Sequence, residues 1–265
     1  MQFVRINDVT VHYDVTAGDA GRPVLVFINS LGTDLRIWHH VVPKLAEDFT
    51  ILTYDKRGHG LSDLGTPPYS IDDHVGDLVG LLEYLELSDV SICGLSVGGL
   101  IAQRAYEKRP DLVRAMILSN TAHKIGTPEM WNQRISAVEA GGIGSMVDDI
   151  MSKWFTPEFR DPDNAAYQGF RNMLLRQPVD GYTGTCAAIR DADFTEAARK
   201  IAVPVLCIAG EDDGSTSPAL VRSLADLISG AQFSIIEDAA HIPCVEAPAA
   251  YAALVRNFLF NDVED

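Results

Sequence analysis

Short apolar runs alternate with segments of helical periodicity along most of this chain. Residues 1–15 alternate between apolar and polar side chains, which is typical of a pair of strands. Further apolar runs are bounded by turn-forming residues and are predicted to be buried strands: 23–29, 49–55, 89–96, 113–119, 203–210 and 231–237. The pattern predicts an α/β fold with a mostly parallel, eight-stranded sheet.

Segments with helical periodicity separate most of these strands. The expected helices are 34–47, 70–87, 98–109, 218–229 and 247–260. Ser70 stands at the N-cap of one of them and Pro218 in the first turn of another. Because helices that connect parallel strands cover both faces of the sheet, we expect a sheet flanked by helices.

Residues 123–200 interrupt this alternation. They combine helical periodicity with repeated Pro and Gly and contain no convincing strand. We therefore expect a helical cap, or lid, inserted between two strands of the sheet. The core would then consist of residues 1–122 and 201–265.

Composition narrows the class of protein. The 265 residues are 47% hydrophobic and 22% charged, without a low-complexity tract, so the chain can bury a full core. A formal net charge of −16 argues against nucleic acid and anionic membranes as partners. The first residues lack a signal-peptide pattern, and no apolar run approaches the roughly 18 residues of a membrane span. We expect a cytoplasmic protein, and a homo-oligomer is compatible with the sequence.

The cysteines do not indicate a metal site. Their spacing does not match that of metal ligands, and most lie in apolar surroundings: Cys93, Cys186, Cys207 and Cys244. We expect reduced thiols in the core.

The most specific chemical motif is GLSVG at residues 94–98, which fits G-x-S-x-G between a predicted strand and a predicted helix. This context is that of a nucleophile elbow, in which small neighbours allow a strained turn at the serine. Ser96 is therefore the candidate nucleophile. A Gly-rich turn that happens to hold a serine is the alternative.

A serine nucleophile needs a base, and the base needs an orienting carboxylate. In this type of site both partners follow the serine in the chain. His241 lies just beyond the last predicted strand and is the candidate base. Three acids, Glu211, Asp212 and Asp213, follow the strand before it, and the residues alone leave the choice among them open.

These motifs resemble those of α/β-hydrolases, and the resemblance implies further roles. Register with their G-x-x-D motif favours Asp213 as the triad acid, with Asp212 as the alternative. The oxyanion donors would be the backbone N–H groups of Val97 and Leu31. Asn29 and Ser30 stand where most of these enzymes carry His-Gly. Because the donor is a backbone group, this departure need not abolish activity.

The D-x-R-G-x-G-x-S loop of these enzymes has a counterpart at residues 54–63, YDKRGHGLSD. We interpret Asp55 and Arg57 as a structural ion pair within this loop rather than as ligands of a substrate.

The chain resembles, more narrowly, the 3-oxoadipate enol-lactonases. The resemblance spans essentially the whole chain and rests on five segments: INSLGTDLRIW (28–38), YDKRGHGLSD (54–63), CGLSVGGLIAQ (93–103), SNTAHKIGTPEMW (119–131) and AAHIPCVEAP (239–248). It implies the stand-alone form of the enzyme, a small anionic lactone as substrate, and no cofactor or metal. Ser96 would attack the lactone carbonyl while His241 and Asp213 act as the base and its orienting acid.

The carboxylate arm of such a substrate needs a local cation, because the long-range field of an acidic protein repels it. Residues 120–134, NTAHKIGTPEMWNQR, offer Lys124, Trp131 and Arg134 at the start of the lid. Arg134 can bind a carboxylate through two hydrogen bonds. Trp131 and Trp154 are candidates for the walls of the pocket. The alternative is that Trp131 only anchors the lid and that Lys124 or Arg134 is solvated.

Three functional hypotheses remain at this point. The first is the specific lactonase. The second is a generic carboxylesterase or cofactor-free perhydrolase that uses the same triad. The third is a non-catalytic α/β-hydrolase homologue that binds a small molecule.

Overall fold

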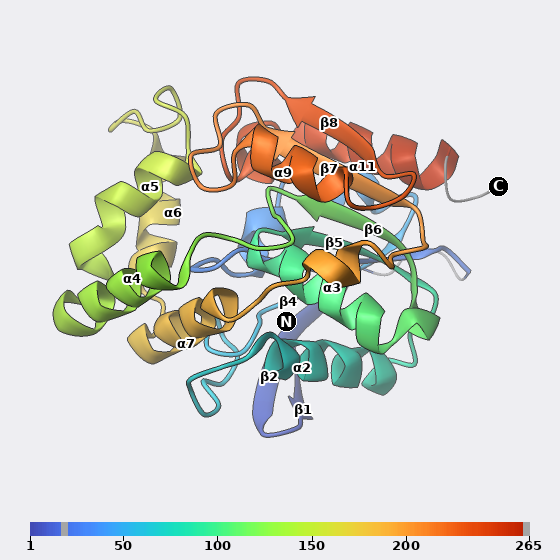
Figure 1. Ribbon diagram of the computed structural model, residues 1–265, viewed down its shortest axis with the longest axis horizontal. Helices are drawn as coiled ribbons and strands as arrows, with labels where there is room; N and C mark the ends of the chain where they lie inside the picture. Colours follow the sequence, from blue (N-terminus) through green and yellow to red (C-terminus); the bar gives the residue numbers. More distant parts are fainter. Residues whose placement is uncertain (17–20, 262–265) are drawn as a thin grey trace.

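An eight-stranded sheet runs through the centre of the protein in the order β1-β2-β4-β3-β5-β6-β7-β8 (Figure 1). The computed structural model describes residues 1–16 and 21–261. The strands are β1 (Gln2–Ile6), β2 (Val9–Thr16), β3 (Val24–Ile28), β4 (Thr50–Tyr54), β5 (Val90–Leu95), β6 (Val113–Ser119), β7 (Val205–Gly210) and β8 (Gln232–Ile236). Only β2 pairs in antiparallel fashion, with β1 and β4, and the other pairings are parallel. The predicted mostly parallel sheet is confirmed.

The central strands are apolar because both of their faces are covered. Every residue of β5 and β7 is buried, whereas the edge strands β1 and β8 are partly exposed. Parallel strands place their carboxyl ends at one edge of the sheet. The loops that follow β3, β5, β6, β7 and β8 therefore meet there.

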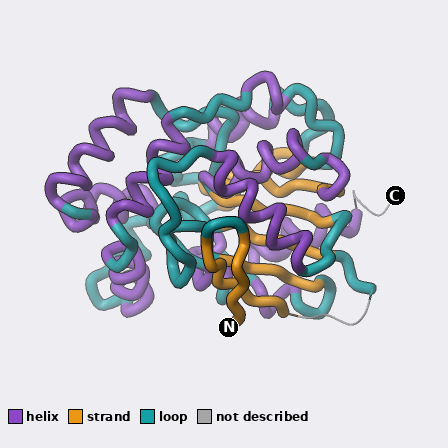
Figure 2. Tube along the Cα trace, turned by 90° about the horizontal axis from the view of Figure 1, so that it is seen from below, coloured by secondary structure: helices purple, strands orange, loops and turns teal. Residues whose placement is uncertain are grey.

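Helices cover both faces of the sheet (Figures 1 and 2). The helices outside residues 123–200 are η1 (Leu35–Trp38), α1 (Val42–Leu45), α2 (Ile71–Tyr84), α3 (Val97–Lys108), η2 (Pro110–Leu112), α9 (Pro218–Ala225), α10 (Pro243–Glu246) and α11 (Pro248–Asn261). Helix α2 begins as predicted, because Ser70 and Asp73 form a reciprocal capping box. None of the described helices has the length and apolar character of a membrane span.

The single helix expected over 34–47 is wrong, because the structure has two short helices there, η1 and α1. Pro43 lies in the first turn of α1. Proline has no N–H to donate to the preceding turn, so it is tolerated in the first turn of a helix but disfavoured in the interior of a single helix over 34–47.

Residues 123–200 connect β6 to β7 and contain helices but no strand. The helices are α4 (Pro128–Gly141), η3 (Ile143–Met146), α5 (Val147–Trp154), α6 (Ala165–Leu175), α7 (Val179–Arg190) and α8 (Thr195–Ala198). In Figure 1, α4 to α7 lie together at the left of the sheet, while α8 contacts α3. We call α4 to α7 the lid.

The lid is joined to the loop that follows β4. The Gly60 N–H donates to Gln177 Oε1 (3.1 Å), and the Tyr69 N–H donates to Gly184 O (3.3 Å). A Cβ atom at Gly181 would lie only 2.1 Å from Gly58 O. Glycine at this position therefore allows α7 to approach the core backbone closely.

The predicted state of the cysteines is confirmed. All of them are free thiols buried in the protein: Cys93, Cys186, Cys207 and Cys244.

Candidate active site

Ser96 stands at the sharp turn between β5 and α3, with φ 59° and ψ −117°. The turn needs small neighbours. A Cβ atom at Gly94 would lie 2.3 Å from Gly98 O, and one at Gly98 would lie 2.3 Å from Ile28 O. The Ser96 N–H donates to Ser119 O (2.9 Å), which fixes the turn to the neighbouring strand β6. The sequence GLSVG therefore has the geometry of a nucleophile elbow.

His241 and Asp213 form a buried pair in the loops that follow β8 and β7. The Nδ1 atom of His241 lies 2.9 Å from Asp213 Oδ2 and 3.1 Å from Asp213 Oδ1. Asp212, the alternative acid, is exposed to solvent, as is Glu211. Of the three acids that follow β7, Asp213 is therefore the one that contacts the imidazole.

Four donors hold the Asp213 carboxylate in place. Asn120 Nδ2 (2.9 Å) and Thr216 Oγ1 (2.7 Å) donate to Oδ2, and the N–H groups of Ser215 (2.7 Å) and Thr216 (2.9 Å) donate to Oδ1. Burial raises the pKa of Asp213, but the His241 imidazole and these hydrogen bonds outweigh it and hold the pKa below its usual range. The carboxylate is therefore ionised and fixed in orientation.

Sequence reasoning missed Asn120 and Thr216 as supporting residues. Asn120 has φ 47° at the end of β6, where an Asn tolerates a left-handed backbone. The visible signal was a polar residue directly after a buried strand at the same edge of the sheet as Ser96.

Residues 29–33, which follow β3, form what we call the oxyanion loop. Within it the Gly32 N–H donates to His59 Nε2 (3.0 Å) and the Thr33 N–H donates to Ser30 O (3.3 Å). In the described part of the chain, the Leu31 N–H donates to no protein group, and neither does the Val97 N–H in the first turn of α3. Two backbone donors are thus free on either side of the elbow.

Ser96 and His241 line the same cavity, whose volume is about 100 Å³. No hydrogen bond joins the Ser96 hydroxyl to the imidazole among the residues that the structure describes, and such bonds are often loose without substrate. Ser30 and Leu31 of the oxyanion loop also line the cavity. Drug-sized ligands occupy roughly 300 Å³ or more. The cavity therefore suits a small substrate.

The lid supplies the opposite wall of this cavity. Trp131, Arg134 and Trp154 line it, and so do Lys153 and Tyr182, which sequence reasoning missed. The Trp131 ring is held in place because its Nε1 donates to Ile125 O (2.6 Å). These aromatic side chains and cations therefore face the candidate nucleophile across a narrow space.

Lys124 does not line the cavity, so the structure does not bring it together with Ser96 and Arg134. Its ammonium lies at the surface, 3.0 Å from Asp193 Oδ2, and its side chain is 45% exposed. The short segment before α4 directs this side chain outward, toward an acid near the end of the lid segment.

Arg134 and Lys153 share one carboxylate at the cavity wall. Asp149 Oδ2 lies 2.9 Å from Lys153 Nζ and 3.9 Å from Arg134 Nη2. The Arg134 guanidinium also lies over the Trp131 ring, 5.3 Å from its centroid. Two cations against one acid leave a local positive charge in a chain whose net charge is −16.

The ion pair predicted between Asp55 and Arg57 is wrong. Arg57 makes two hydrogen bonds of 2.7 Å to Asp77 of α2, and Asp55 lies 2.7 Å from His12 Nδ1. Asp55 also accepts from the N–H groups of Leu35 and Leu61. The two side chains therefore tie different elements to the loop instead of pairing with each other.

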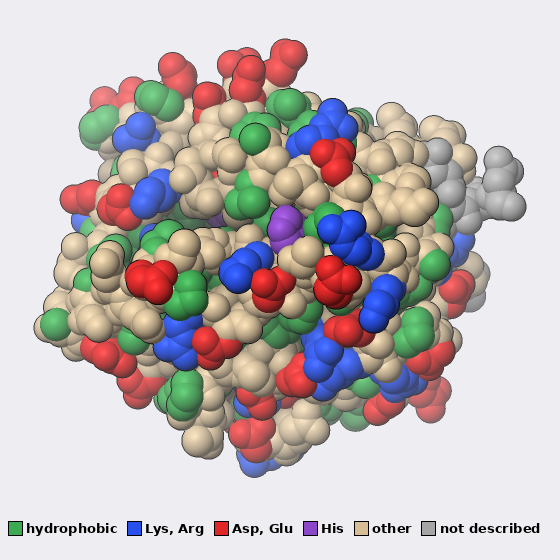
Figure 3. Space-filling view, in the orientation of Figure 1, with side chains coloured by type: hydrophobic (Ala, Val, Ile, Leu, Met, Phe, Trp, Pro, Cys, Tyr) green, Lys and Arg blue, Asp and Glu red, His purple; other side chains and the backbone are tan. Residues whose placement is uncertain are grey.

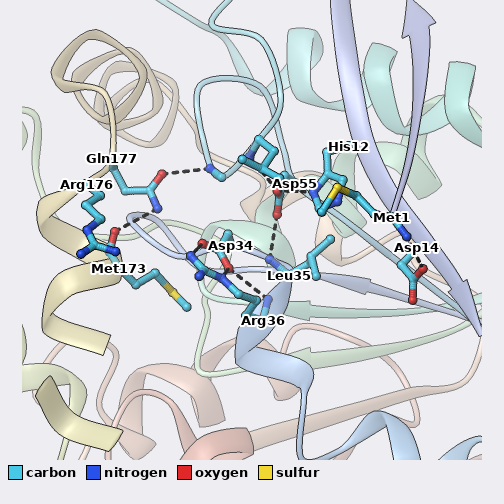
Figure 4. A pocket seen from close by; sticks show the side chains of 12 residues that line it. Met1, His12, Asp14, Asp34, Leu35, Arg36, Asp55, Met173, Arg176 and Gln177 are labelled. Atoms are coloured by element: carbon cyan, nitrogen blue, oxygen red, sulfur yellow. Dashed lines mark hydrogen bonds and ion pairs between the residues drawn. The ribbon is translucent and has the colours of Figure 1, made fainter. Parts of the chain in front are cut away.

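A larger cavity, of about 610 Å³, lies beside His12 and Asp55 (Figure 4). It does not include Ser96 or His241. Most of its acids are paired: Asp55 with His12, and Asp34 with Arg36 at 2.6 Å. The candidate nucleophile and the candidate base therefore both lie in the smaller cavity. Among the described residues, no cluster of His, Cys, Asp or Glu could hold a metal ion.

The chain is similar to known proteins in both sequence and structure. The model of the family described as "Alpha/beta hydrolase family" matches residues 25–254. The chain is 34% identical to 3-oxoadipate enol-lactonase 2 of Acinetobacter baylyi over 92% of this chain and 91% of that protein. It is 32% identical to 3-oxoadipate enol-lactonase 1 of the same organism, over 91% and 90%. The crystal structure of the enol-lactonase from Burkholderia xenovorans LB400 matches with a TM-score of 0.94 and 34% identity, over 98% of this chain and 100% of that one.

Proposed function

The chain belongs to the alpha/beta hydrolase family, and we propose that it opens 3-oxoadipate enol-lactone to 3-oxoadipate through an acyl-enzyme on Ser96. One observation carries this proposal: Ser96, His241 and the two lid cations line one small cavity. The first two groups suit acyl transfer, and the cations suit the carboxylate arm of the lactone. The names of the relatives at 34% and 32% identity support the same substrate.

In the first half of the proposed reaction, Ser96 Oγ attacks the lactone carbonyl and His241 takes its proton. The carbonyl oxygen becomes an oxyanion that accepts from the N–H groups of Leu31 and Val97. Asp213 keeps Nδ1 of His241 protonated, so that Nε2 is free to act as the base. The ring C–O bond then breaks, and the departing enol oxygen takes the proton from His241.

In the second half, water replaces the enol as the partner of His241. The imidazole takes a proton from this water, the resulting oxygen attacks the acyl-enzyme, and the same two N–H groups stabilise the second oxyanion. Collapse returns the proton to Ser96 Oγ and releases a carboxylate. Addition of one water opens the ring, and tautomerisation of the enol gives 3-oxoadipate.

The acetate arm of the lactone would bind to the lid. Arg134 offers two parallel donors to a carboxylate and Lys153 offers a point charge. Trp131 and Trp154 would pack against the ring and keep water out. Because these contacts remain the same in ground state and transition state, they should act mainly on KM.

The test compares the enol-lactone with p-nitrophenyl acetate, a neutral ester, on the wild-type protein and on Ser96→Ala. We expect efficient lactone opening that Ser96→Ala abolishes. Fast cleavage of the ester without turnover of the lactone would instead indicate a general esterase. Turnover of neither compound would indicate a binding protein.

A further inference from the structure

Two buried side chains from the loop that follows β4 support the oxyanion loop. Lys56 Nζ donates to Ser30 O (2.6 Å) and to Thr33 O (3.3 Å). His59 Nε2 accepts from the Gly32 N–H (3.0 Å). Lys56 is 2% exposed and His59 is fully buried, so neither contacts substrate. A buried lysine is costly, and its place directly behind the proposed oxyanion hole calls for a physical reason.

We propose that Lys56 and His59, which we call the oxyanion clamp, are positioning residues that fix the direction of the Leu31 N–H. The clamp acts on the two peptide units that flank Leu31. The inference rests on the proposed acyl transfer at Ser96, in which that N–H stabilises the oxyanion.

The action of Lys56 follows from the planarity of the peptide bond. Ser30 C=O and Leu31 N–H belong to one peptide unit, and in a trans unit these two groups point in opposite directions. Lys56 holds the Ser30 oxygen on the core side of the loop. The Leu31 N–H must then point away from Lys56, and Leu31 itself lines the cavity that contains Ser96.

His59 fixes the peptide unit on the other side of Leu31. Its Nδ1 lies 3.2 Å from Arg57 O, which can only accept, so Nδ1 carries the proton and Nε2 accepts from Gly32. Burial, together with the nearby Lys56 charge, holds the pKa of His59 well below its ordinary value. The imidazole therefore stays neutral and keeps its acceptor for the Gly32 N–H.

Release of either contact would permit a competing conformation. If the Ser30–Leu31 peptide unit rotated by half a turn, it would direct a carbonyl oxygen toward the developing oxyanion and remove a donor. Gly32, at φ +77°, gives similar freedom to the next peptide unit, Leu31–Gly32, which His59 restrains. The lid packs against Gly32, since a Cβ at this residue would lie 2.7 Å from Leu174. The clamp supplies the restraint on the opposite side.

The test uses Lys56→Met, His59→Leu and His59→Gln, with His74→Leu as the matched control. His74 is another buried histidine, but its Nε2 faces Thr185 of the lid (3.4 Å) rather than the oxyanion loop. For each variant we would measure kcat and KM with p-nitrophenyl acetate and the affinity for a phenylboronic acid. This acid forms a tetrahedral adduct with a serine, and one of its oxygens occupies the oxyanion hole.

We expect Lys56→Met and His59→Leu to lower kcat by about 100-fold, the typical cost of losing one oxyanion donor, with little change in KM. The affinity for the boronic acid should fall by a similar factor. His59→Gln should recover most of both losses, because its side-chain oxygen can accept from Gly32. His74→Leu should leave both quantities close to wild type.

Two results would overturn the clamp. One is wild-type kcat and boronic acid affinity in Lys56→Met. The other is an equal loss in His59→Gln and His74→Leu, which would indicate general destabilisation; circular dichroism and active-site titration would measure the folded fraction of each variant. Failure of the proposed serine mechanism would show separately, as turnover that persists in Ser96→Ala.

Discussion

At the residue scale, Ser96 and Asp213 depend on neighbours that do no chemistry themselves. Ser96 keeps a positive φ, which costs on the order of 1–3 kcal/mol, because Gly94 and Gly98 leave room for the turn. Asp213 keeps its orientation because Asn120 and Thr216 donate to it. Substitutions of such neighbours should therefore change catalysis more than substrate binding.

Asn120→Ala tests this expectation. The variant removes a 2.9 Å hydrogen bond to an ionised carboxylate, which is typically worth about 1.5–3 kcal/mol. If the loss falls on the transition state, kcat should drop by roughly tenfold or more while KM changes little. Asn172→Ala, an exposed asparagine on α6, is the control. A rise of KM by a similar factor, with no change in kcat, would contradict a role of Asn120 in orienting Asp213.

The buried Lys56 should make the stability of the protein depend on pH. Burial lowers its pKa to about 7 from an ordinary 10.5, against the opposing effect of Asp55 and Asp34. Between these two pH values the unfolded chain binds more protons than the folded chain, so this group makes the protein more stable as pH rises. The buried charge of Lys56 therefore destabilises the folded protein most at pH 7 and below.

Lys56→Met removes this destabilising charge. Its Tm, relative to wild type, should be highest near pH 6 and should fall as pH rises toward 10. Thermal unfolding followed by circular dichroism at several pH values measures this difference. A difference in Tm that does not change with pH would mean that Lys56 keeps an ordinary pKa in the folded protein.

At the element scale, α4 and α5 of the lid hold the cations that we assign to the substrate carboxylate. Arg134 projects from α4 and Lys153 from α5, and both lie near Asp149. Asp149 is exposed and competes for the same cations that a substrate would use. The strength of carboxylate binding thus depends on how these two helices pack.

Arg134→Ala should raise KM for the lactone about tenfold or more, since a hydrogen-bonded ion pair is lost, and should leave KM for p-nitrophenyl acetate nearly unchanged. Lys124→Ala is a matched control, because Lys124 is a cation of the same segment that points to the surface. Steady-state kinetics on both substrates would measure the effect. Equal changes on the ester and the lactone would remove Arg134 from this role.

Sequence patterns predicted most elements because buried strands and helices have recognisable local patterns of apolar residues. The strand expected over 113–119 is observed over the same residues, since its apolar run is bounded by a turn at each end. Contacts between segments that are distant in the sequence have no such local pattern. The pairing of Arg57 with Asp77, the approach of Lys153 to the cavity and the outward direction of Lys124 depend on how helices pack, so the sequence could not predict them.

At the scale of the whole molecule, the net charge opposes the proposed substrate. In Figure 3, Asp and Glu side chains are scattered over the face shown, with Lys and Arg side chains among them. A net charge of −16 repels an anion at long range, whereas Arg134 and Lys153 attract it at the site. Because salt screens long-range repulsion more than contacts in a partly buried cavity, kcat/KM for the lactone should rise between about 10 and 100 mM salt.

The ester provides the comparison for this effect. Since p-nitrophenyl acetate is neutral, its kcat/KM should stay nearly constant over the same range of salt. A fall in kcat/KM for the lactone would mean that local attraction, and not the overall field, governs its capture.

The central claim is that Ser96 carries the acyl group during opening of the enol-lactone. Rapid acid quenching of the reaction, followed by mass spectrometry of the digested protein, tests it most directly. We predict that the peptide containing Ser96 gains the mass of the lactone within the first turnover and that Ser96→Ala neither gains this mass nor turns over. Lactone opening that continues in Ser96→Ala, without an acylated peptide in the wild type, would contradict the account.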